Sequence, residues 1–188
     1  MRTFGLFIIP FLLFSGMSNG PSGVSDPGNT DTSAFEFTVP NEPNMLFYIQ
    51  RSVNENTIIY ALKLKPDGSI NSKDPVDVYW RRYQEDGRRE ELDFVQRTFV
   101  YGLRTKDLGD KIELRCIGFD KMPVYVYKNG AGTAARHAMV VVNEKLMLLD
   151  RVFIQINGGT YWFPNVEYAE FSGSDPVNGA PISELYYR

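Results

Sequence analysis

The chain has 188 residues, which is enough for one domain with a sizeable core and does not require two. Its 23 acidic residues outnumber its 20 Lys and Arg residues, so the net charge of −3 gives no electrostatic reason to expect nucleic-acid binding. Because Cys116 is the single cysteine, an internal disulfide is excluded and the fold must be stabilised by its own core.

The first 18 residues have the pattern of a secretory signal. Arg2 supplies a positive charge, residues 4–14 form an uncharged apolar stretch, and small residues follow at Ser15, Gly16 and Ser18. The stretch is short for a membrane-spanning helix, and this order is typical of a cleaved export signal. We therefore predict a signal peptide at residues 1–18 and an exported protein, periplasmic or extracellular, with no transmembrane span in the mature chain. An uncleaved membrane anchor is the alternative.

Residues 19–43 are rich in Gly, Pro, Ser, Asn, Asp and Thr, a composition that favours a flexible leader. Within it, residues 35–39 alternate apolar and polar side chains and suggest local order. We expect a single β-rich domain over residues 44–188, with its folded part beginning near Phe35 or Met45.

Short runs of β-branched and aromatic residues alternate with turn residues through the rest of the chain, and each run predicts a strand. Turn sequences such as Pro66-Asp67-Gly68, Asn129-Gly130 and Asn157-Gly158-Gly159 separate several of them. Strands this short and regularly spaced predict a mainly β fold, an antiparallel β-barrel or closed β-sandwich of about 8–9 strands. The predicted strands are residues 45–51, 57–64, 76–83, 111–119, 123–128, 134–142, 146–156, 160–163 and 166–171.

One segment has a helical period instead. Leu92, Val95, Gln96 and Phe99 recur at helical spacing with charged residues between them, which predicts one short α-helix at about residues 89–101. The acidic residues of the segment 90–93 would then begin the helix, where negative charge is favoured.

Most enzyme signatures are absent. With His137 as the single histidine, the usual Ser-His, Cys-His and multi-histidine metal sites are excluded, and there is no nucleophile elbow or phosphate-binding glycine loop. We interpret His137 as an ordinary strand residue and Cys116 as a small buried hydrophobe. We predict no catalytic residue, no metal and no cofactor, although two facing carboxylates, which a sequence does not reveal, would suffice for glycoside chemistry.

Aromatic and cationic residues are concentrated in residues 79–83, with Arg51 and Arg97 elsewhere in the chain. Strand alternation places Trp80 and Arg82 on one face and Tyr79 and Arg81 on the other. One interpretation is a pocket in which aromatic rings supply contact area and an arginine binds a carboxylate or phosphate. The other is a core of aromatic residues whose arginines pair with acids or stack on rings.

Several spaced motifs resemble a bacterial exported family known only as domain of unknown function 4833, over about residues 45–171. The motifs are Phe47-Tyr48-Ile49-Gln50-Arg51, Asn54 and Asn56 before Thr57-Ile58-Ile59-Tyr60, Pro75-Val76-Asp77-Val78-Tyr79-Trp80, and Gln96 with Tyr101-Gly102-Leu103. The resemblance implies an exported protein of one domain and carries no activity. With Arg82 added from the aromatic run, the candidate ligand-binding residues are Arg51, Asn54, Asn56, Trp80, Arg82, Gln96 and Tyr101, although the two asparagines also suit a hairpin turn.

Three functions follow as hypotheses. The first is a non-enzymatic domain that binds a small molecule, lipid-like or anionic, in the interior or mouth of the β-structure. The second is a cell-envelope hydrolase that uses carboxylates with Arg or Tyr. The third is a module that binds another envelope protein through a sheet edge or an aromatic patch.

Overall fold

The computed structural model describes residues 36–128, 136–160 and 164–187. The predicted signal peptide, the first part of the predicted leader, the Asn129-Gly130 turn and most of the predicted strand 160–163 lie outside these ranges. Within them, no helix combines the length and the apolar character that crossing a membrane requires.

The described residues form a mainly β domain with one short helix, as predicted. The described ranges contain eleven strands where eight or nine were expected, because the short or polar strands β4, β5 and β11 lack the apolar alternation that marks the others. In chain order the elements are β1 (Met45–Arg51), β2 (Asn54–Leu62), β3 (Val76–Arg81), β4 (Arg89–Glu91), α1 (Phe94–Phe99), β5 (Leu103–Asp107), β6 (Lys111–Cys116), the 3₁₀ turn η1 (Ile117–Phe119), β7 (Val124–Tyr127), β8 (Ala138–Val142), β9 (Lys145–Gly159), β10 (Pro164–Ser174) and β11 (Pro181–Tyr186).

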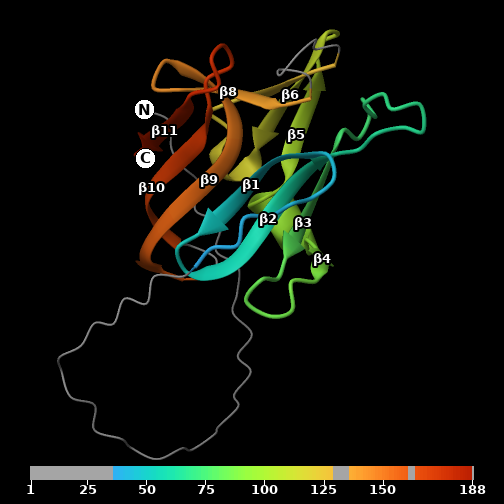
Figure 1. The fold of residues 1–188 in the computed structure, drawn as a ribbon. Helices are drawn as coiled ribbons and strands as arrows, with labels where there is room; N and C mark the ends of the chain where they lie inside the picture. Colours follow the sequence, from blue (N-terminus) through green and yellow to red (C-terminus); the bar gives the residue numbers. More distant parts are fainter. Residues whose placement is uncertain (1–35, 129–135, 161–163, 188) are drawn as a thin grey trace, which may run out of the picture. The chain divides into compact units, whose positions relative to one another are not determined.

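The long strand β9 joins two halves of one sheet (Figure 1). Along one edge it pairs first with β8, which continues through β7 and β6 to β5, and then with β1, which continues through β2 and β3 to β4. Its other edge pairs with β10, which carries β11. The β1–β9 pairing is parallel, so the prediction of a wholly antiparallel sheet is wrong. These two strands are far apart in sequence and therefore need no hairpin between them.

The sheet curls into a half-barrel and remains open. Among the described strands, β4 and β5 each pair with a single neighbour and not with each other, so the predicted closed barrel or sandwich is not observed. The main core lies inside the curl and takes side chains from both halves, including Phe47 and Trp80 from one and Leu114 and Val126 from the other. The space between the two halves also holds the candidate site.

Helix α1 is shorter than predicted, because residues 89–91 pair with β3 as β4. Asp93 caps the helix: its carboxylate accepts a hydrogen bond from the Gln96 backbone N–H at 2.7 Å, and the Gln96 side chain accepts one from the Asp93 N–H at 3.2 Å. Of the four residues whose spacing predicted the helix, Leu92 and Gln96 are buried, whereas Val95 and Phe99 are 38% and 65% exposed.

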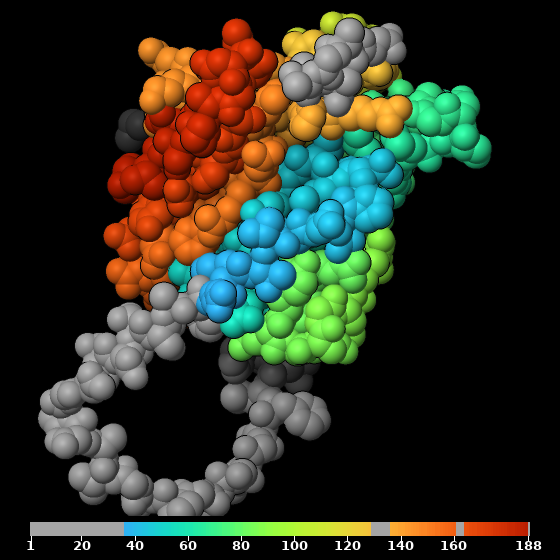
Figure 2. Space-filling view, in the orientation of Figure 1, coloured from blue at the N-terminus to red at the C-terminus, as the bar shows by residue number. Residues whose placement is uncertain are grey.

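Residues 36–43, assigned above to the leader, contact the sheet on its outer face. The carbonyl of Thr38 accepts a hydrogen bond from Gln50 Nε2 at 2.9 Å, and Glu42 accepts two from the Arg81 guanidinium at 2.6 and 2.8 Å. The Arg81 hydrogen bond holds the pKa of Glu42 below its usual value. In Figure 2 this segment, in blue, forms one surface with the strand that follows it.

Candidate functional site

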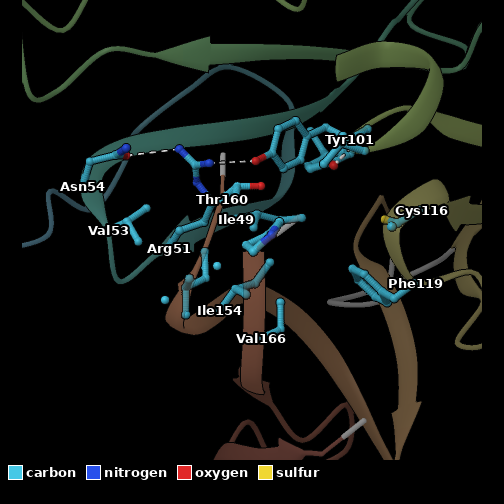
Figure 3. A pocket seen from close by; sticks show the side chains of 17 residues that line it. Ile49, Arg51, Val53, Asn54, Tyr101, Cys116, Phe119, Ile154, Thr160 and Val166 are labelled. Carbon is cyan, nitrogen blue, oxygen red and sulfur yellow. Dashed lines mark hydrogen bonds between the residues drawn. The ribbon is translucent and has the colours of Figure 1, made fainter. Parts of the chain in front are cut away.

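A cavity of about 670 Å³ opens between the two halves of the sheet, a volume typical of small-molecule sites. Its wall takes residues from β1, β2, η1, β9 and β10 and from the segment after α1. Most of them are apolar, and Figure 3 shows Ile49, Ile154 and Val166 with the ring of Phe119 around the space. The cavity therefore has a mainly apolar surface for contact with a small molecule.

Arg51, the last residue of β1, is the one charged side chain among the described residues of this wall. Its Nη1 donates a hydrogen bond to the Tyr101 hydroxyl at 2.9 Å and its Nη2 donates one to Asn54 Oδ1 at 3.3 Å (Figure 3). Asn54 is in place because it pairs directly with Arg51 across the tight β1–β2 hairpin. The guanidinium also lies 5.0 Å from the centre of the Trp80 ring, a favourable cation–π distance.

Among the residues that the structure describes, the Arg51 charge has no acidic partner. In the part of the chain that the structure describes, ten other lysines and arginines form ion pairs with Asp or Glu, and Arg51 forms none. Both of its hydrogen-bond acceptors are neutral, and its buried Nε has no hydrogen-bond partner within the described ranges. A partly buried cation without a counter-ion is unfavourable, and an anion in the adjoining cavity would relieve that cost.

The floor of the cavity includes Tyr60 and Cys116. Tyr60 is fully buried, and its hydroxyl donates a hydrogen bond to the Tyr101 carbonyl at 2.8 Å. This bond helps to hold Tyr101, whose own hydroxyl accepts from Arg51. Burial raises the pKa of the Tyr60 hydroxyl above its usual value and raises that of the Cys116 thiol to about 12. Cys116 is therefore a protonated, buried side chain, as predicted, and lacks the thiolate character of a nucleophile.

Trp80 and Gln96 support the site from behind. Trp80 is 1% exposed, and its indole Nε1 donates a hydrogen bond to Gln96 Oε1 at 3.0 Å. Its ring also packs edge-to-face on Tyr101, with ring centres 5.2 Å apart. Both residues were predicted as ligand contacts, and neither is in the described cavity wall. Trp80 contacts both Arg51 and Tyr101, and the Gln96 carbonyl accepts a hydrogen bond from the Tyr101 N–H at 2.8 Å.

Arg82 and Asn56, also candidates, do not line the cavity. Arg82 forms an ion pair with Glu90 and lies 4.8 Å from the centre of the Trp80 ring, which matches the interpretation of arginines paired with acids and stacked on rings. Asn56 is buried and accepts a hydrogen bond from the Gln84 N–H at 3.2 Å. Of the seven candidates, the structure brings Arg51, Asn54 and Tyr101 together at the cavity.

The apolar wall was missed by sequence reasoning. Phe119, Ile154, Ile156 and Val166 come from segments that the sequence separates widely from Arg51. Each of these residues occurs in an apolar stretch of sequence that is typical of a protein core. No local sequence pattern therefore distinguishes a cavity-lining residue from a core residue. The β1–β9 register, in which Arg51 pairs with Ile154, is what brings them together.

The described wall contains no Asp or Glu, so this cavity does not present the pair of carboxylates that glycoside hydrolysis requires. Among the described residues there is also no cluster of three or more His, Cys, Asp or Glu side chains suited to a metal ion. His137 is exposed and lies outside the wall. The described wall therefore presents one cation, neutral polar groups and apolar surface.

A search of protein families matched residues 47–185 to the family described as Domain of unknown function (DUF4833). The match covers most of the chain and confirms the resemblance drawn from the motifs. Searches of curated proteins and of solved structures found no match.

Proposed function

We propose that this chain, which belongs to the family described as Domain of unknown function (DUF4833), is a non-enzymatic domain that binds a small molecule with an anionic group and an apolar body. The observation that carries the proposal is Arg51, a cation without an acidic partner in the described residues, at the wall of an apolar cavity. The export pattern of residues 1–18 extends the proposal to a protein that works in the periplasm or outside the cell.

A bound anion would supply acceptors for the unused donors of Arg51. A guanidinium has five N–H donors, and Arg51 uses two of them on neutral oxygens. A carboxylate or phosphate would supply both the missing charge and a matching pair of acceptors. The apolar wall would then bind the remainder of the molecule by excluding water.

The test uses two fluorescent probes that differ chiefly in charge, anilinonaphthalene sulfonate and the neutral N-phenylnaphthylamine, titrated separately into the full chain. We expect one anionic probe to bind per chain, at least about tenfold more tightly than the neutral probe, because a hydrogen bond to a charged group contributes about 1.5–3 kcal/mol. In Arg51→Met the anionic probe should lose this advantage, while the affinity of the neutral probe changes little.

Arg151→Met is the matched control. Arg151 also lacks an ion pair in the described residues and donates to the neutral Gln50 Oε1 at 2.8 Å, but it lies outside the cavity wall. This variant should keep the wild-type preference for the anionic probe. Equal binding of the anionic probe by wild-type and Arg51→Met protein would show that Arg51 holds no anion and would overturn the proposal.

A further inference from the structure

A second, smaller cavity of about 170 Å³ adjoins the first. The two share four wall residues, Gly118, Phe119, Ile154 and Val166. Beyond them the second cavity continues between η1 and the strands β9 and β10, where Val152, Ala169 and Phe171 add apolar surface. Arg51 belongs to the first cavity alone, so its partly buried charge lies toward one end of the combined space.

Phe119 stands at the junction of the two cavities. Its ring packs edge-to-face on the buried Phe171, with ring centres 5.7 Å apart, which places it against the wall of the second cavity while it bounds the first. In Figure 3 Phe119 lies on the opposite side of the site from Arg51 and Asn54, with Ile154 between them. A ligand held at Arg51 that extends along the apolar wall therefore meets this ring.

From this arrangement, and resting on the proposed function, we infer that the ligand is a single-chain amphiphile. Its anionic head binds Arg51, its alkyl chain follows Ile154 and Val166, and Phe119 determines the chain length that fits. A compact anion would use only the first cavity and leave the apolar extension unfilled. The second cavity has two charged residues, Asp120 and Lys121. Both are exposed to solvent, and Asp120 already forms an ion pair with Arg104 at 3.8 Å, so they attract a second ionic group more weakly than the partly buried Arg51 does.

The test is calorimetric titration of the full chain with straight-chain carboxylates of increasing length, from butanoate to hexadecanoate, each below its critical micelle concentration. Affinity should rise about fourfold for each methylene that becomes buried and stop rising at the length that reaches Phe119. Phe119→Ala, which joins the cavities, should move that limit to longer chains by several carbons. Phe94→Ala, a change at an exposed phenylalanine outside both walls, should leave the limit where it is.

A second variant, which narrows the cavity, allows the same test if Phe119→Ala does not fold. Val166→Phe adds a ring beside the shared wall and should move the limit to shorter chains. A limit that is the same in wild-type protein and in the folded variants would overturn the role of Phe119.

Two further outcomes separate this inference from the proposed function. If short and long carboxylates bind with equal affinity, and binding still requires Arg51, then the ligand is not an amphiphile. The proposal that Arg51 binds an anion would still hold. If alkyl alcohols bind as tightly as carboxylates of the same length, then the two cavities bind an alkyl chain, but Arg51 does not bind an anionic head.

Discussion

Arg51 and Arg81 each occupy the last position of a β-strand, yet their surroundings differ in charge. Arg81 donates two hydrogen bonds to Glu42, whose side chain is only 9% exposed. Arg51 donates to the neutral oxygens of Tyr101 and Asn54 and faces a cavity. The first arrangement is what a structural arginine requires, whereas the second leaves the cation available to a ligand.

This contrast predicts different effects on stability. Without ligand, Arg51→Met should change the free energy of unfolding by less than about 1 kcal/mol, because the lost hydrogen bonds and ring contact are offset by removal of a poorly compensated charge. Arg81→Met should lower it by about 2 kcal/mol or more, because the nearly buried Glu42 loses its ionic partner. Urea denaturation of the full chain measures both values. A large loss in Arg51→Met, equal to that in Arg81→Met, would identify Arg51 as a structural residue.

At the scale of elements, the hydrogen bond between Trp80 and Gln96 attaches α1 to β3. Gln96 Oε1 accepts from the Trp80 indole and from the Asp93 N–H, so one side chain both caps the helix and satisfies a buried donor. Tyr101, two residues beyond α1, is thereby held where it meets Arg51. The helix contributes to the site by position, although its own apolar residues face outward.

We predict that Gln96→Leu lowers the free energy of unfolding by about 2 kcal/mol, because it leaves the buried indole N–H without an acceptor and removes half of the capping box. Adding Trp80→Phe should recover part of the loss, since the unsatisfied donor disappears with the indole. A double-mutant cycle measured by thermal or urea unfolding isolates this coupling. Purely additive losses in the double variant would contradict the assigned hydrogen bond.

The elements that could be predicted from sequence were those with apolar alternation. Strand β1 matches its predicted bounds, and β3, β6 and β7 lie within theirs. The strands β4 and β5 have mainly charged residues, and β11 alternates weakly, so pairing with neighbours in the sheet, not local pattern, makes them strands. The helical period of residues 92–99 predicted α1 correctly but not its whole buried face, because tertiary contacts bury Leu92 and Gln96 and leave Phe99 exposed.

For the whole molecule, the decisive feature is the parallel pairing of β1 with β9. It connects the two halves of the sheet and places Arg51 beside Ile154, so that the cavity exists only in the assembled domain. Arg51, Asn54 and Tyr101 lie in the motifs that resemble the family, which is why they could be proposed from the sequence. The apolar wall could not be proposed, because its residues differ from ordinary core residues only in facing an empty space.

A crystal structure of the full chain bound to decanoate labelled with bromine at the end of its alkyl chain would show directly whether Arg51 binds the anionic head. We expect the carboxylate oxygens at about 3 Å from the Arg51 guanidinium nitrogens and the anomalous bromine signal in the apolar cavity on the Phe119 side. A carboxylate bound away from Arg51, or a bromine signal outside the cavity, would contradict this proposal.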